Sequence, residues 1–150
     1  MNRHFYNFIA MFNKAIKTGQ WTFDIPLRNK FVLTFLNFLL KEKLIEDYRF
    51  LGKRPDLDNP SGAKLGKKQS PYYCPIEIRL KHDLVKGIFS VSTPGKYDFM
   101  NAHRLRLYSE IGTGAGGVVV CSSAKLGRLC TARELIVQGE GALVVCVVKI

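Results

Sequence analysis

The chain has 150 residues, 47% of them hydrophobic and ten of them Phe, which is enough apolar material for one domain or two small, closely packed ones and excludes disorder throughout. Its formal net charge of +11 indicates an anionic partner, of which nucleic acid is the commonest kind and an anionic membrane surface the alternative. No apolar run approaches the roughly 20 residues of a membrane-spanning helix.

The first part of the sequence predicts an α-β-α-β-β arrangement. Apolar residues from Phe5 to Ile16 recur at helical spacing and predict an amphipathic helix, which ends at Thr18-Gly19 because glycine suits a helix C-cap. The elements expected after it are a strand at Thr22–Ile25, a helix at Arg28–Lys43, and strands at Tyr48–Leu51 and Ile76–Leu80.

The N-terminal helix admits other interpretations. It carries Arg3, Lys14 and Lys17 and no acidic residue, which is also typical of a mitochondrial presequence. We favour a structural helix, because the segment is poor in Ser and its apolar stripe suits a core. A peripheral membrane protein that uses this basic helix is a further alternative.

The composition changes sharply between Gly52 and Gln69. Pro, Gly, Asp and Asn residues occur there together with Lys and Arg, and they predict a basic insertion without regular structure. A domain boundary is expected near His82–Gly87. The predicted fold class is α+β, with two small α/β domains: an N-terminal domain at residues 1–85, and a β-rich C-terminal domain with one helix at residues 86–150.

The C-terminal part is predicted to be nearly all β. Leu105 and Leu107 alternate with arginines in the way of a strand, and Thr131–Glu134 fits the S/T-x-x-E capping box, which predicts one helix that ends at Gly139 or Gly141. The other expected elements are a strand at Ile88–Ser92, a turn at Thr93-Pro94-Gly95, and buried strands at Val118–Cys121 and Ala142–Val148.

Enzyme and metal chemistry find little support in the sequence. The stretch Gly112–Gly117 matches G-x-G-x-x-G, but it leads into a strand instead of opening a helix, so we expect no cofactor; a nucleotide-binding enzyme stays an alternative. Ser122 is not in a G-x-S-x-G elbow. The four cysteines have no C-x-x-C spacing and are expected to be small buried residues in a reducing compartment, with no metal: Cys74, Cys121, Cys130 and Cys146.

The stretch S-S-A-K-L-G-R at 122–128 follows a buried strand. A strand–loop–helix connection would present the hydroxyls of Ser122 and Ser123, with Gly127 allowing a bend and the close approach of another surface. Hydroxyls bond to RNA base edges and 2′-hydroxyls, while Lys125 and Arg128 attract phosphates. An ordinary polar loop without a partner is the alternative.

The chain resembles the family of the bacterial-type small-subunit ribosomal protein eight. That family has a Ser-Thr-Ser-Lys-Gly loop before a helix that begins with Thr and contains an Arg-Glu pair, a Pro-Gly turn, a second helix led by Ser-Lys, and a final Cys-containing strand. The similar segments here are Ser122–Lys125 with Gly127, Thr131–Glu134, Ser92–Gly95, Arg28–Tyr48 and Val144–Val147. The order and spacing of these segments agree over nearly the whole chain.

The sequence departs from the family pattern at several positions. Ala124 replaces the third hydroxyl of the loop, Leu126 and one further residue lengthen that loop, and Thr93 replaces the basic residue before Pro-Gly. The segment at 52–69 reads as an insertion. These departures indicate a divergent member, mitochondrial rather than from a free-living bacterium.

The resemblance implies a structural protein of the small ribosomal subunit that binds a central-domain helix of the small-subunit rRNA early in assembly and catalyses nothing. Its partners would be that rRNA and neighbouring small-subunit ribosomal proteins, with no membrane, no small-molecule substrate and no cofactor. We expect it in the mitochondrial ribosome, with the plastid or bacterial cytoplasm as alternatives. The residues expected to bind rRNA are Ser122, Ser123, Lys125, Gly127, Arg128, Ser92, Pro94, Gly95, Lys96, Lys14, Lys17, Arg28 and Lys30.

Overall fold

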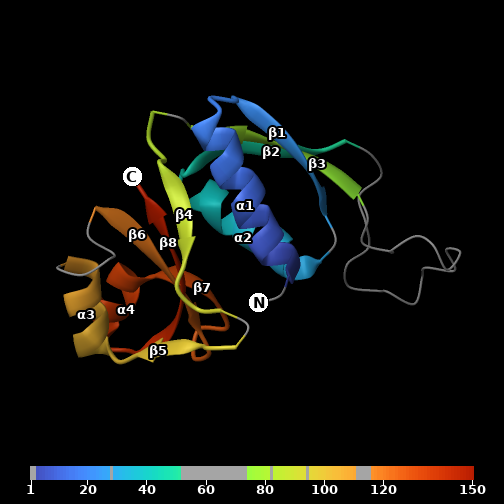
Figure 1. Cartoon of the computed structure of the whole chain (residues 1–150). Coiled ribbons are helices and arrows are strands. Elements are labelled where there is room, and N and C mark those ends of the chain that lie inside the picture. The colour runs from blue at the N-terminus through green and yellow to red at the C-terminus, as the bar shows by residue number, and fades with distance from the viewer. Residues whose placement is uncertain (1–2, 28, 52–73, 82, 94, 111–115) are drawn as a thin grey trace, which may run out of the picture. The chain divides into compact units, whose positions relative to one another are not determined.

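The computed structural model describes residues 3–27, 29–51, 74–81, 83–93, 95–110 and 116–150, without the side chain of Cys74. Over these ranges the expected α+β class is confirmed. The chain divides into two compact units, Asn2–Asp83 and Leu84–Ile150, which Figure 1 shows from blue to green and from yellow to red. The predicted insertion at 52–69 lies outside the described residues, and none of the described helices is long and apolar enough to cross a membrane.

The N-terminal unit is a three-stranded antiparallel sheet with the strand order β1-β3-β2. Figure 1 shows both of its helices on the same side of that sheet. Its elements are α1 (Arg3–Lys17), β1 (Thr22–Leu27), α2 (Lys30–Lys41), β2 (Ile45–Phe50) and β3 (Cys74–Leu80). The helices and strands expected in this part are therefore confirmed, with ends that shift by a few residues.

A cluster of phenylalanines forms the core of the N-terminal unit. Phe5 and Phe8 of α1 and Phe35 of α2 are 0–2% exposed. The ring centroid of Phe35 lies 5.0 Å from that of Phe5 and 5.8 Å from that of Phe8, both edge to face, which is the preferred geometry for aromatic pairs. The apolar stripe read from the sequence is thus the face that α1 buries.

Helix α2 starts and stops for local reasons. The side chain of Asn29 accepts a hydrogen bond from the backbone N–H of Val32 at 3.0 Å, so Asn29 is the N-cap. At the other end Lys43 adopts a left-handed conformation with φ of 59°, which α-helical backbone does not allow. The helix is therefore shorter than the Arg28–Lys43 expected from periodicity, and Arg28 lies outside the described residues.

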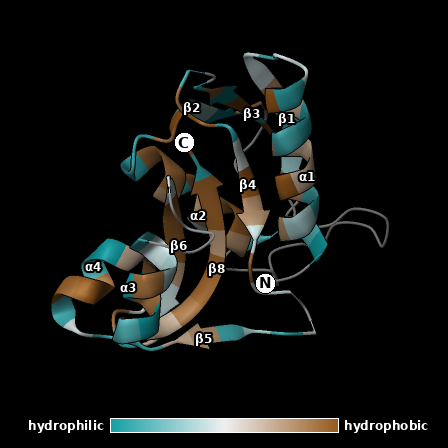
Figure 2. Ribbon diagram, turned by 60° about the vertical axis from the view of Figure 1, so that its left-hand side comes forward, coloured by the Kyte–Doolittle hydropathy of each residue, from teal (hydrophilic) through white to brown (hydrophobic). Residues whose placement is uncertain are grey.

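The C-terminal unit is a five-stranded antiparallel sheet around β8. The strand order is β4-β8-β6-β7, and β5 pairs with a different part of β8 than β4 does. In Figure 2, β8 and β6 are coloured as mostly hydrophobic. The elements are β4 (Gly87–Ser90), β5 (Asp98–Met100), α3 (Ala102–Glu110), β6 (Gly117–Ser123), β7 (Arg128–Thr131), α4 (Ala132–Gln138) and β8 (Ala142–Lys149).

The predicted helix start at Thr131 is confirmed: Thr131 is the N-cap of α4, whereas the Glu134 carboxylate pairs with Arg128. The side chain of Thr131 accepts a hydrogen bond from the backbone N–H of Glu134 at 3.4 Å, and the helix ends at Gly139, which has φ of 71°. Leu135 of this helix is completely buried and packs in one cluster with Leu105 of α3 and Val144 of β8. Helices α3 and α4 therefore share one core with the sheet.

The strand expected around Leu105 and Leu107 is wrong, because this segment is helix α3. Asn101 caps the helix: its side-chain oxygen accepts a hydrogen bond from the backbone N–H of Arg104 at 2.8 Å. Leu105 is buried and Tyr108 is half-buried, whereas Leu107 is exposed. The segment therefore buries residues at helical spacing, and the C-terminal unit has two helices among its described residues instead of the one expected.

We predict that Phe35→Ala lowers the free energy of unfolding by about 3–5 kcal/mol, because it removes a fully buried ring from the phenylalanine cluster. Leu40→Ala, on the exposed side of the same helix, should cost less than about 1 kcal/mol. Urea denaturation of both variants measures the difference. Equal losses would contradict the assigned core.

Candidate nucleic-acid interface

The stretch at 122–128 forms a β-hairpin. The expected strand–loop–helix connection is wrong, because β7 lies between the turn and α4. Ser122 pairs with Leu129 and Ser123 with Arg128 across the hairpin. The backbone N–H of Gly127 donates to the carbonyl of Ser123 at 2.8 Å, and Gly127 has φ of 66°, which glycine adopts without strain.

The two serines differ in position. Ser123 is 3% exposed, and its Oγ accepts a hydrogen bond from the backbone N–H of Leu126 at 3.1 Å. This side-chain-to-backbone bond closes the turn. The Ser122 side chain is half-buried and lines a surface hollow. The structure thus places the Ser122 side chain at the surface hollow and gives the Ser123 hydroxyl a role inside the turn.

Strand register places Ser122 in a row with two apolar residues. In β8, Leu143 pairs with Phe99 of β5 on one side and with Ser122 of β6 on the other. Directly opposed residues in an antiparallel sheet project from the same face. Phe99 is 67% exposed, so one face of the sheet carries an open aromatic ring, a leucine and a hydroxyl side by side.

The three residues of the row line a surface hollow of about 430 Å³, which we call the hairpin hollow. Lys125 contributes a cation at its edge, and Asn101 an amide. Its lining residues are Phe99, Met100, Asn101, Ser122, Ala124, Lys125, Gly141, Ala142 and Leu143. Sequence inspection missed Phe99, because nothing in the local pattern showed that β5 lies across β8 from the hairpin.

Both cations of the hairpin form ion pairs. The ammonium of Lys125 lies 2.6 Å from Oε1 of Glu140, and the guanidinium of Arg128 lies 2.9 Å from Oε2 of Glu134. All four side chains remain partly exposed, with 72% of Lys125 and 33% of Glu140 accessible. Exposed pairs of this kind contribute only about 0–1 kcal/mol, so a phosphate can replace either carboxylate at small cost.

The turn expected at Thr93-Pro94-Gly95 is supported by the described residues on either side of Pro94, within the segment 92–96. The backbones of Thr93 and Lys96 form two hydrogen bonds, at 2.9 and 3.0 Å, and Gly95 and Lys96 are exposed, whereas Pro94 lies outside the described residues. Ser92 is fully buried. Its hydroxyl donates to the carbonyl of Val144 and accepts from the N–H of Asp98 at 3.0 Å, so Ser92 connects the turn to β8.

The remaining predicted RNA-binding residues belong to the N-terminal unit. Lys14 and Lys17 are exposed in the last turn of α1, and Lys30 is exposed at the start of α2. The structure brings together Ser122, Lys125 and the turn that Ser123 and Gly127 shape. The three lysines belong to the N-terminal unit, whereas Ser122, Lys125 and the turn belong to the C-terminal unit.

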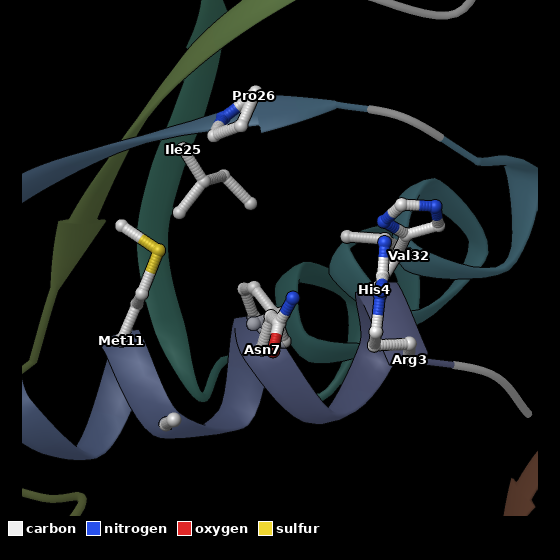
Figure 3. A pocket seen from close by; sticks show the side chains of 9 residues that line it. Arg3, His4, Asn7, Met11, Ile25, Pro26 and Val32 are labelled. Carbon is white, nitrogen blue, oxygen red and sulfur yellow. The ribbon is translucent and has the colours of Figure 1, made fainter.

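A second hollow, of about 380 Å³, lies in the N-terminal unit between α1, β1 and α2. Figure 3 shows Arg3 and His4 toward one end of it and Met11 toward the other, with Ile25 and Pro26 of β1 across from the helix. None of the sequence-predicted RNA-binding residues lines this hollow.

The described cysteines are buried and free. Burial raises the pKa of Cys121 to about 12 and also raises the pKa values of Cys130 and Cys146. A thiol must lose its proton to act as a nucleophile or metal ligand, so these environments oppose both roles. No group of three His, Cys, Asp or Glu residues suited to a metal occurs within the described ranges, and the Cys74 side chain lies outside them.

Strand packing explains why the last residue of the glycine-rich stretch is a glycine. Gly117 begins strand β6, and a Cβ added there would lie 2.8 Å from the carbonyl oxygen of Val148. The close approach of two strands therefore requires this glycine. Residues 112–115 of the G-x-G-x-x-G match lie outside the described ranges.

In comparisons with known proteins, no family model matches the chain and no curated protein sequence matches it.

We predict that Ser123→Ala lowers the free energy of unfolding by about 0.5–1.5 kcal/mol, because the backbone N–H of Leu126 loses its acceptor in a partly buried turn. Ser122→Ala is the matched control and should change stability by less than about 0.5 kcal/mol. Thermal or urea denaturation compares the two variants. A larger loss for Ser122→Ala would contradict the roles assigned to the two serines.

Proposed function

We propose that the protein is a structural, rRNA-binding component of the small ribosomal subunit, a divergent relative of the bacterial-type small-subunit ribosomal protein eight that acts in mitochondria. Its sheet face at Phe99, Leu143 and Ser122 binds an irregular part of the small-subunit rRNA. The resemblance of the chain's motifs to that family supports the choice of RNA, and the hairpin hollow supports the mode of binding.

The observation that carries the proposal is the row across β5, β8 and β6. An exposed aromatic ring at Phe99 offers a stacking platform, and the Ser122 hydroxyl, two strands away, donates to or accepts from a base edge. Lys125 at the edge of the same hollow attracts a phosphate. Stacking, edge recognition and a nearby cation are the combination by which proteins bind unpaired RNA bases.

Charge supplies affinity that does not depend on sequence. The formal net charge is +11, and several exposed cations have no acidic partner within the described residues: Lys14, Lys17, Lys86, Lys96 and Arg133. Such cations gain free energy from polyanions through the release of condensed counterions. RNA binding uses this excess charge, whereas an uncharged ligand would not.

The two rival functions fit the structure less well. A peripheral membrane protein would insert the apolar face of α1, but Phe5, Phe8 and Phe12 on that face are buried against the rest of the unit. A dinucleotide-binding enzyme would need its glycines to open a helix, and Gly117 opens strand β6 instead. Binding to RNA requires neither the exposure of the apolar face of α1 nor a helix that begins at the glycines.

The direct test is to express the tagged chain in its source cells and to sequence the RNA that co-purifies with it. We predict enrichment of small-subunit rRNA, and a binding constant for a central-domain transcript that falls steeply with salt, each neutralised phosphate adding roughly 0.7–0.9 to the log–log slope. Enrichment of other RNA alone, or a slope near zero, would contradict the proposal.

We predict that Phe99→Ala weakens binding of the central-domain transcript by about 1–3 kcal/mol, because an unpaired base loses its stacking surface. Ser122→Ala should cost about 0.5–1.5 kcal/mol with that RNA and less with an unrelated one. Phe89→Ala is the matched control, because Phe89 is an exposed aromatic on β4 of the same unit and does not line the hairpin hollow. Filter binding measures all three, and an equal effect of Phe99→Ala and Phe89→Ala would show that the row is not the binding face.

A further inference from the structure

The electrostatics of the hairpin contrast with the charge of the whole chain. A protein with a net charge of +11 places a carboxylate against each of the two cations that flank its turn, Glu140 on Lys125 and Glu134 on Arg128. The local charge at the hairpin is therefore close to neutral. A surface built only to attract phosphates would leave these cations unpaired.

The fold holds Glu140 in place. The backbone N–H of Gly139 donates to the carbonyl of Ile136 at 3.1 Å, and that of Glu140 to the carbonyl of Leu135 at 2.9 Å, which together form a Schellman motif at the end of α4. On its other side, a Cβ at Gly141 would lie 2.7 Å from the carbonyl oxygen of Met100. Two glycine-dependent contacts thus flank Glu140 and direct it to Lys125 at the edge of the hairpin hollow.

We propose that Glu140 is a specificity-determining residue of the RNA site, where it accepts a hydrogen bond from an amino or imino N–H of an unpaired base and repels a misplaced phosphate. The inference rests on the proposed function. A carboxylate and a phosphate are both negatively charged, so they repel each other, and because a carboxylate only accepts hydrogen bonds it offers the phosphate oxygens no donor. Base edges carry N–H donors, which a carboxylate binds.

The exposed ion pair with Lys125 can be exchanged for contacts with RNA. In the free protein the ammonium neutralises Glu140 at 2.6 Å. An RNA with the correct shape offers a phosphate to Lys125 and a base N–H to Glu140, so both members of the pair gain a new partner. An RNA that offers only phosphates satisfies Lys125 and leaves Glu140 facing negative charge. The ion pair therefore favours RNAs that present both groups together.

The test is Glu140→Gln, which keeps the size of the side chain and removes its charge. Binding of a length-matched RNA of unrelated sequence should tighten roughly two- to fivefold, and its salt dependence should steepen, because Lys125 is released from its pair. Preference for the central-domain transcript over that RNA should fall roughly fivefold or more. Circular dichroism and thermal denaturation establish that the variant is folded.

Glu110→Gln is the matched control, because Glu110, like Glu140, forms an exposed ion pair with a basic residue of the same unit, here Arg106 at 3.5 Å, but it does so on α3. If Glu140→Gln changes preference and salt dependence no more than Glu110→Gln does, the proposal is wrong. In a Lys125→Gln background, Glu140→Gln should still reduce the preference. Loss of its effect there would show that Glu140 acts only by holding Lys125, which also overturns the proposal.

The same data separate this inference from the proposed function. If the wild-type protein shows no preference for the central-domain transcript, the proposed ribosomal function is wrong. The proposed hydrogen bond between Glu140 and a base is then wrong as well. If the preference is present and unchanged in Glu140→Gln, the ribosomal assignment stands and only the role of Glu140 is refuted.

Discussion

The pairing of one strand, β8, with both β5 and β6 is the constraint on which the candidate site depends. Leu143 of β8 is the common partner of Phe99 and Ser122. An aromatic ring and a hydroxyl that are distant in the sequence therefore lie on either side of Leu143 on one face of the sheet. The contact also requires Gly141, because any side chain there would collide with the backbone of Met100. Backbone geometry therefore determines which side chains form the hairpin hollow.

The second organising feature is how charge is distributed. Cations without a described acidic partner occur on α1, before β4, at the 92–96 turn and on α4, whereas the hairpin itself carries paired charges. In the proposed function, general attraction to RNA and selective contact would therefore belong to different residues. Ser123 and Ser92 are both buried: the Ser123 hydroxyl bonds to the backbone N–H of Leu126 within its turn, and the Ser92 hydroxyl bonds to backbone groups of Val144 in β8 and Asp98 in β5.

Elements governed by local periodicity were predicted well. The stripe from Phe5 to Ile16 identified α1, alternation identified β3, and the capping box at Thr131 identified α4. Two predictions failed where short segments carry ambiguous patterns. Alternating Leu and Arg residues favoured a strand where Asn101 caps a helix, and no local signal marked β7, a four-residue strand that exists because β6 lies beside it.

The sequence by itself determined the α+β class, most of the elements, the excess of positive charge and the hydroxyl-rich stretch at 122–128, because these depend on residues close together in the chain. Only the tertiary structure decided that Ser123 serves the turn while Ser122 lines the hollow, that Phe99 lies in the same row, and that Glu140 pairs with Lys125. These are contacts between residues distant in sequence or on opposite faces of one strand, and cross-strand register sets them.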